Sequence, residues 1–165
     1  MTAKIELRDI VTEADRASAL ALRVGPGQED FVATVEQSFR DAIDDARACP
    51  RMWSVMAGER VVGFVMISDG IPAERLASDD DLMGPYYLWR LLIDRNEQRK
   101  GYGTAVLDAV VAYLAGRPGA DVLWTSAGRG PGSPQPFYER YGFVATGDFF
   151  GHEAVLRLDL RDRDR

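Results

Sequence analysis

The sequence predicts one domain of the mixed α/β class, with a twisted, mostly antiparallel sheet of about six or seven strands and about four flanking helices. A length of 165 residues suits one domain that buries a core without disulfides or metal. Strand-like and helix-like stretches alternate, and no repeat or linker divides the chain. The domain is therefore expected to span residues 1–165, with a core over about 4–160 and a tail over 161–165.

The N-terminal third predicts one strand followed by two helices. Alternating apolar residues predict the strand over 4–10. Thr12 then offers an N-cap for a helix over 13–24, where apolar residues recur at helical spacing. The Gly-Pro-Gly run at 25–27 breaks the chain, and a second amphipathic helix is expected over 29–48.

The middle of the chain predicts a hairpin, a long loop and a buried strand. Two apolar runs flank Gly58-Glu59, which is a two-residue turn signal. The long loop carries Gly, Pro and an acidic run, and its length is typical of functional loops. The expected elements are strands over 52–57 and 60–67, a loop over 68–85 and a strand over 86–93.

The last part of the chain predicts two helices and three strands. Gly101-Tyr102-Gly103 opens the first of these helices, and Ser133 and Gly142 are expected to cap the second. The two C-terminal strands form a hairpin around Gly151. The expected ranges are a helix to about 115, a strand over 121–125, a loop over 127–134, a helix to about 140, and strands over 143–150 and 153–160.

Composition excludes several classes of function. The chain carries 20 Lys and Arg against 26 Asp and Glu, a net charge of −6, which disfavours nucleic acid and favours small cationic partners. No leader and no membrane-length apolar run is present, so a soluble cytoplasmic protein without membrane contact is expected. Cys49 and His152 are single, so we expect neither a disulfide nor a metal site, and His152 falls in a turn.

The segment 86–114 carries the chemical signal. It reads as a buried strand, a short polar loop and a Gly-x-Gly at a helix start. The first amides of a helix lack partners and carry partial positive charge, and Arg99 and Lys100 add formal charge beside them. The pattern therefore predicts an anion cradle, although a tight strand–helix turn is the alternative. The dinucleotide fingerprint is excluded because Val106 stands where it needs Gly.

Two motifs carry a resemblance to a known family. Residues 98–103, Gln-Arg-Lys-Gly-Tyr-Gly, resemble the Gln/Arg-x-x-Gly-x-Gly/Ala motif of the GNAT superfamily of N-acetyltransferases. Residues 136–143, Pro-Phe-Tyr-Glu-Arg-Tyr-Gly-Phe, resemble its "FYE-x-x-GF" segment, and the order of elements over about 4–160 is also similar. The strand 87–94 looks most like that of bacterial spermine/spermidine (diamine) acetyltransferases.

The resemblance implies acetyl-CoA as cofactor and direct transfer of its acetyl group to a primary amine in a ternary complex. It implies that the strand backbone pairs with the pantetheine arm, and that this strand splays from the one over 121–125. The residues that it implies for pyrophosphate binding, through their amides, are Arg99, Lys100, Gly101, Tyr102, Gly103 and Thr104, and those for pantetheine are Leu91, Leu92 and Ile93.

Tyr138 resembles the general acid of the family, because the departing thiolate needs a proton and a phenol can donate one. A purely packing role is the alternative for Tyr138, and Tyr141 is the second candidate for the acid. The family's Asn-x-x-Ala-x-x-x-Tyr pattern is altered here, because Pro131 and Pro134 stand at the Asn and Ala positions. Ser133 or a backbone group is expected to replace the missing Asn contact.

The base and the acceptor stay open at this level. The base candidates are Glu29, Asp30, Glu36, Asp94 or a chain of waters. Trp89 and Arg90 are neighbours on a strand, so one of the two is expected to point into the acceptor cleft. The expected acceptor is a small cationic amine such as a polyamine. The alternatives are a protein N-terminus or lysine, or a CoA-binding module without catalysis, and a homodimer is compatible with the exposed ends of the sheet.

Overall fold

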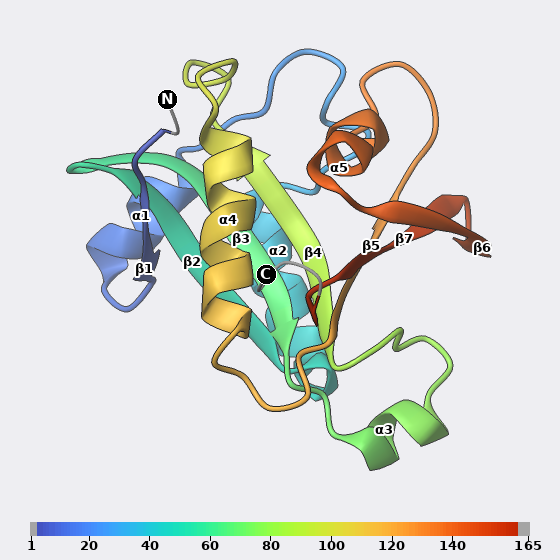
Figure 1. The fold of residues 1–165 in the computed structure, drawn as a ribbon. Helices are drawn as coiled ribbons and strands as arrows, with labels where there is room; N and C mark the ends of the chain where they lie inside the picture. The colour runs from blue at the N-terminus through green and yellow to red at the C-terminus, as the bar shows by residue number, and fades with distance from the viewer. Residues whose placement is uncertain (1–2, 162–165) are drawn as a thin grey trace.

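The protein forms one seven-stranded mixed sheet in the strand order β1-β2-β3-β4-β5-β7-β6 (Figure 1). The computed structural model describes residues 3–161, so positions 162–165 of the expected tail lie outside the described residues. Within that range every strand pair is antiparallel except β4–β5. The predicted fold class is therefore confirmed.

The N-terminal part contains β1 (Glu6–Asp9), α1 (Glu13–Leu20), α2 (Val35–Asp44) and a short 3₁₀ helix, η1 (Ala46–Ala48). Thr12 caps α1 as expected, and its side chain forms a reciprocal capping box with Asp15. The expected bounds of both helices are wrong. The chain leaves α1 early because the Arg23 amide donates to the side chain of Asp94, and α2 begins late because Thr34 caps it.

The middle part contains β2 (Pro50–Ala57), β3 (Arg60–Asp69), α3 (Ala73–Ser78) and β4 (Tyr86–Ile93). The hairpin turn at Gly58 uses a positive φ of 63°, which glycine adopts without strain. The expected loop over 68–85 is partly wrong, since β3 continues into it and α3 forms within it. This short helix raises the number of α-helices in the described residues from the expected four to five.

The last part contains α4 (Tyr102–Leu114), β5 (Val122–Ala127), α5 (Gln135–Tyr141), β6 (Val144–Phe150) and β7 (Glu153–Asp159). Gly142 follows α5 with a φ of 131°, as its predicted capping role requires. The N-cap of α5 is Pro134 rather than Ser133, which instead accepts a hydrogen bond from the Gln135 amide. The elements of this part otherwise fall near their predicted ranges.

Helices cover both faces of the sheet and divide the core in two. In Figure 1, α4 crosses the front of the sheet, while α1 and α2 lie behind it. Buried residues of α4, among them Val106 and Val110, pack on one face, and Phe39 of α2 with Ala19 of α1 packs on the other. None of the helices in the described residues is both long and apolar enough to span a bilayer.

Candidate functional site

The site lies where β4 and β5 separate. These strands pair only at Tyr87–Trp124 and Leu88–Thr125, and beyond Leu88 no ladder pairs form between them in the described part of the chain. The register of β3 against β4 also shifts at Trp89, which marks a β-bulge. Because β5 turns away, the C-terminal half of β4 keeps one backbone edge open within the sheet.

A cleft of about 470 Å³ opens along this edge and reaches the N-terminus of α4, and we call it the cofactor cleft because the residues predicted to bind the cofactor gather there. It collects eight of the ten predicted site residues, although the position alone does not test their roles. Leu92 points into the core behind the sheet and Lys100 lies outside the cleft. The eight predicted residues that line it are Leu91, Ile93, Arg99, Gly101, Tyr102, Gly103, Thr104 and Tyr138.

The N-terminus of α4 is built to stay uncovered. Gly101 occupies the N-cap position with a φ of 83°, and no side chain caps the first amides. Gly103 has a different requirement, because an added Cβ there meets the Phe137 ring at 3.0 Å. The first glycine thus shapes the turn, and the second allows α5 to pack beside α4.

Gln98 connects the cleft to the segment between α1 and α2. Its Nε2 donates to the Ile93 carbonyl at 2.9 Å and to Gln28 Oε1 at 2.7 Å. Gln28 Oε1 also accepts from the Gly25 amide at 3.0 Å. Gln98, the first residue of the predicted motif, therefore ties β4 to the segment that forms the opposite wall of the cleft. The Ile93 carbonyl already accepts a hydrogen bond from Gln98, so it is not available to a ligand.

Positive charge at the cleft comes from side chains without acidic partners. Lys100 Nζ donates to Glu97 Oε2 at 2.9 Å, and Arg60 binds the other oxygen of that carboxylate. Arg99 and Arg140 line the cleft, and neither forms an ion pair within residues 3–161. The uncapped helix terminus and these two guanidinium groups fit a polyphosphate.

Tyr138 stands at the inner end of the cleft. It is 6% exposed and packs against Phe143 and Phe137. Burial raises the pKa of Tyr138 well above its usual range, and a hydrogen bond with the side chain of Thr125 offsets only part of that rise. Thr125 is also the last residue of β5 that pairs with β4, so Tyr138 lies at the divergence point.

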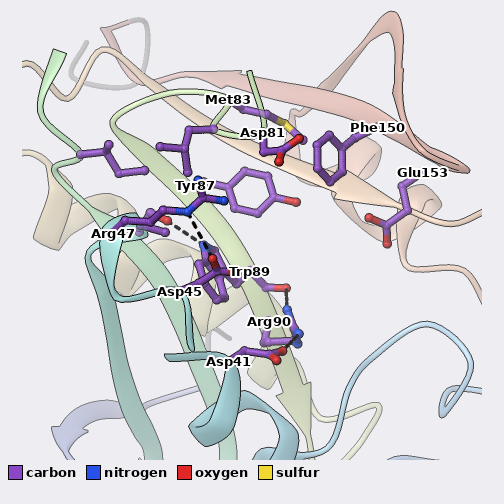
Figure 2. Close-up of a pocket in the computed structure, with 14 residues that line it drawn as sticks. Asp41, Asp45, Arg47, Asp81, Met83, Tyr87, Trp89, Arg90, Phe150 and Glu153 are labelled. Atoms are coloured by element: carbon purple, nitrogen blue, oxygen red, sulfur yellow. Dashed lines mark hydrogen bonds and ion pairs between the residues drawn. The ribbon is translucent and has the colours of Figure 1, made fainter. Parts of the chain in front are cut away.

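Two further cavities lie beyond the cleft, and Tyr138 lines the first of them. The proximal cavity, about 390 Å³, shares Leu91 and Tyr138 with the cleft. The distal cavity, about 410 Å³, follows it past Tyr87 and Glu153 (Figure 2). The three spaces adjoin through shared walls, and Tyr138 stands at the junction of the cleft and the proximal cavity.

Trp89 and Arg90 both line the two cavities, so the expectation that only one of them does is wrong. The bulge explains this, since an extra residue breaks the alternation of side chains along β4. Arg90 Nη2 binds Asp41 Oδ2 at 2.6 Å, as the dashed contact in Figure 2 shows, and Trp89 Nε1 donates to Ser68 Oγ. The guanidinium charge of Arg90 is therefore neutralised from α2.

Acidic groups dominate the walls of these cavities. Arg47 is paired with Asp45 and Asp79, as Arg90 is with Asp41. The acidic side chains that line the cavities and form no ion pair within residues 3–161 are Glu29, Asp30, Asp81 and Glu153. The combined space is suited to a cationic ligand.

The four predicted base candidates separate into two groups. Glu29 and Asp30 line the proximal cavity. Glu36 faces solvent beside Arg40, and the Asp94 carboxylate accepts from the amides of Arg23 and Asn96, so both are away from the cavities.

The other single candidates lie elsewhere. Tyr141 donates to Asp108 and lines none of the three cavities, and His152 occupies the β6–β7 turn as predicted. Cys49 is half-buried at the C-cap of η1, where Arg75 Nη1 lies 3.5 Å from its sulfur. No cluster of potential metal ligands forms within residues 3–161.

Sequence reasoning missed three residues of the proximal cavity, namely Tyr87, Ser126 and Glu153. The Tyr87 hydroxyl lies 2.5 Å from Ser126 Oγ, which donates to Glu153 Oε2 at 2.8 Å. They come from β4, β5 and β7, so no local motif joins them. The adjacency of these strands in the sheet is the only signal, and it requires the topology.

The splayed strands, the uncapped helix and the cleft define an acyltransferase fold, and the chain belongs to the acetyltransferase (GNAT) family, whose profile matches residues 27–143. The spermine/spermidine N(1)-acetyltransferase of Bacillus subtilis (strain 168) is 28% identical over 152 residues, covering 89% of this chain and 94% of that protein.

Solved structures share the fold. An acetyltransferase from Thermus thermophilus has a TM-score of 0.68 at 20% identity, with 96% of this chain and 99% of that chain covered. A PaiA N-acetyltransferase from Thermoplasma acidophilum, in complex with coenzyme A, has a TM-score of 0.62 at 14% identity, with 94% and 99% covered. Family membership makes this protein an acetyltransferase that uses acetyl-CoA, and the uncapped N-terminus of α4 with Arg99 and Arg140 fits that cofactor.

Proposed function

We propose that the protein acetylates a primary amine of a small polycationic molecule, such as a polyamine, by direct transfer within a ternary complex. The observation that carries the proposal is the meeting of the cofactor cleft and the acidic proximal cavity at Tyr138. When the acetyl donor and the amine are bound on the two sides of the Tyr138 side chain, the acetyl group can pass directly between them without a covalent enzyme intermediate.

The cofactor cleft would hold acetyl-CoA mainly through backbone groups. The amides of residues 99–104 and the side chains of Arg99 and Arg140 bind the pyrophosphate, and the open edge of Leu91–Ile93 aligns the pantetheine arm. Because Gln98 occupies the carbonyl of Ile93, the remaining contacts fall to the other backbone groups of β4. When bound, acetyl-CoA supplies a thioester acetyl group and a thiolate leaving group.

Tyr138 would hold the proton that the departing sulfur needs. Burial keeps its phenol protonated throughout the neutral range, since its pKa is raised. The hydroxyl group of Tyr138 then donates its proton to the leaving sulfur as the amine attacks, and the proton that the nitrogen loses as the amide forms restores the phenol. Pro134 at the N-cap of α5 and the packing on Phe143 fix the ring of Tyr138, and Ser133, which lines the cleft, is available for the cofactor contact that an Asn would make.

The acceptor cavities favour an amine with a second positive charge. The proximal cavity receives the reacting nitrogen beside Tyr138, and the distal cavity continues toward Asp81 and Glu153. A flexible chain with a distant ammonium group gains attraction along this path, whereas an anionic acceptor is repelled. The likeness to a spermine/spermidine acetyltransferase supports the same substrate class.

The test is an acetylation panel with release of the CoA thiol as readout. We expect spermine and spermidine to have higher kcat/KM than monoamines of equal length, and the acetyl group to be on a primary nitrogen by mass spectrometry. A lysine-bearing peptide and a free N-terminal peptide represent the protein-directed alternative. Turnover of these peptides alone contradicts the substrate class, and CoA binding without turnover of any amine contradicts the reaction.

A further inference from the structure

The proposed reaction requires a group that removes a proton from the incoming amine. Alkylammonium groups have a pKa near 10, so most of the acceptor arrives protonated and cannot attack. Asp94 and Glu36 are outside the cavities. The proximal cavity, however, presents a hydrogen-bonded chain of three side chains that the reaction as described leaves unused.

We infer that Glu153 is the proton acceptor for the amine, acting through Ser126 and Tyr87; this inference rests on the proposed function. The chain runs across three adjacent strands, from Tyr87 on β4 through Ser126 on β5 to Glu153 on β7. All three residues line the proximal cavity beside Tyr138.

The direction of the hydrogen bonds sets the direction of proton movement. A carboxylate only accepts, so Ser126 donates to Glu153, and its oxygen accepts from the Tyr87 hydroxyl. Within residues 3–161 the Tyr87 oxygen accepts no hydrogen bond, and Tyr87 lines the proximal cavity, so a lone pair of this oxygen is available to the amine. In Figure 2 this hydroxyl points toward the part of the pocket where Glu153 lies.

The step balances without a further reactant. The ammonium N–H bond breaks and its proton moves to the Tyr87 oxygen. The former phenolic proton moves to Ser126 Oγ, whose own proton moves to Glu153 Oε2. The products are a neutral amine with a free electron pair and a neutral Glu153 carboxyl group, while Tyr87 and Ser126 return to their starting protonation states.

The environment supports a relay rather than a charged intermediate. Burial raises the pKa of Tyr87, so its phenol stays neutral and passes protons instead of storing charge. Glu153 lies at the rim of a further surface cavity beside His152, so it can release the proton to solvent. Tyr87 and Glu153 both line the proximal and distal cavities, and of the two only Glu153 lines the surface cavity. The other titratable and charged groups that line these spaces are Glu29, Asp30, Asp41, Asp45, Arg47, Asp81, Arg90, Arg129, Tyr138 and His152.

The test compares pH profiles of kcat/KM for Glu153→Gln, Ser126→Ala and Tyr87→Phe, with the best amine of the panel. At pH 7 each variant is expected to lose about 10²-fold, the lower end of what general base catalysis contributes. The loss shrinks toward pH 9.5, because the amine then loses its proton to bulk solvent. Ser126→Thr keeps a hydroxyl and restores most of the activity, and Glu59→Gln, in the exposed β2–β3 turn, leaves it unchanged.

Several results overturn the relay. A loss in Glu153→Gln without a loss in Ser126→Ala and Tyr87→Phe means that the carboxylate acts directly or only attracts the ammonium. A loss of kcat/KM that is equal at every pH means that the three side chains have only a structural role. Unchanged CoA affinity of the variants argues against such a structural role. The wild type gives a test without variants, since several protons in flight predict a curved dependence of kcat/KM on the deuterium fraction of the solvent, and a linear one contradicts the relay. If the wild type acetylates no amine, the proposed function itself fails.

Discussion

The cofactor cleft and the acceptor cavities adjoin at Tyr138, yet the sequence encodes them in opposite ways. Half of the residues that line the cleft come from one continuous stretch, β4 with the turn and helix that follow it, and the key groups of this stretch are backbone amides. The acceptor cavities draw side chains from α2, η1 and α5, from the five strands β3, β4, β5, β6 and β7, and from the loops between them. A backbone site needs a turn geometry, whereas a side-chain site needs the complete topology.

The largest effect is expected at the junction of the two regions. Tyr138→Phe removes the acid but keeps the ring packing, so kcat falls by roughly 10²–10⁴-fold while CoA affinity stays unchanged. Thr125 still donates to the Leu88 carbonyl, so no buried hydroxyl is left without a partner. Steady-state kinetics with a CoA-binding titration measure both quantities.

Tyr141→Phe is the matched control, because Tyr141 lines none of the three cavities. Equal losses in the two variants argue against Tyr138 as the acid. The raised pKa of Tyr138 also predicts that the wild type shows no alkaline loss of kcat from this group up to pH 9.5, since the phenol remains protonated. A loss that begins below pH 9 contradicts this assignment.

The second effect tests the backbone character of the cofactor cleft. Gly101→Asp places a carboxylate at the uncapped end of α4, and Gly101→Asn places an amide of the same shape there. Both residues tolerate the positive φ better than most, so the pair differs mainly in charge. CoA is expected to bind the Asp variant roughly tenfold more weakly than the Asn variant, and added salt narrows the gap.

Isothermal titration with CoA measures this difference. If the two folded variants bind CoA with equal affinity, the pyrophosphate does not bind at the N-terminus of α4. The same titration on Lys100→Gln is expected to give nearly wild-type affinity, because the Lys100 side chain does not line the cleft and its ammonium group is bound to Glu97.

The accuracy of the sequence reasoning follows this division. The strand over 86–93, the helix opened by Gly101 and the closing hairpin were predictable, because apolar period and turn residues are local properties. The helix expected over 29–48 failed at its start, since the Gln28–Gln98 contact and the Thr34 cap override the periodicity. Glu153 was invisible as a site residue because 27 positions separate it from Ser126.

The bulge on β4 was also beyond the sequence. Nothing in the run Leu88-Trp89-Arg90 marks an extra residue, and regular alternation predicts opposite faces for Trp89 and Arg90. The register against β3, which only the folded sheet defines, turns both into the acceptor cavities. The sequence shows that the Asn before Tyr138 is missing, but it does not show that Pro134 occupies the N-cap position of α5.

A third and smaller effect tests the electrostatics of the acceptor cavities. Arg90→Gln leaves Asp41 without its ion pair but still bound by Gln37, which adds one net negative charge to the cavities. Asp41→Asn leaves the Arg90 charge uncompensated. For a polycationic amine, KM is expected to fall about fivefold in the first variant and rise about fivefold in the second.

The opposite signs make this pair informative. A purely steric effect would change KM in the same direction in both variants. An electrostatic effect lowers KM in Arg90→Gln and raises it in Asp41→Asn. A monoamine serves as the control substrate, because its KM responds less to the distal charge than that of a diamine or triamine. Reversed signs indicate an acceptor with an anionic end.

The smallest effect separates both regions from the rest of the fold. Thr12→Ala removes the side chain that caps α1 by accepting from the Asp15 amide at 3.0 Å, at a position remote from the three cavities. Loss of such a cap is expected to lower the unfolding free energy by about 1 kcal/mol, with kcat and both KM values unchanged. Denaturant unfolding and steady-state kinetics on the same preparation test this. A change in kcat or KM would mean that α1 affects the geometry of the cleft. The connection would be the hydrogen bond from the Arg23 amide, after the end of α1, to the side chain of Asp94, which follows β4.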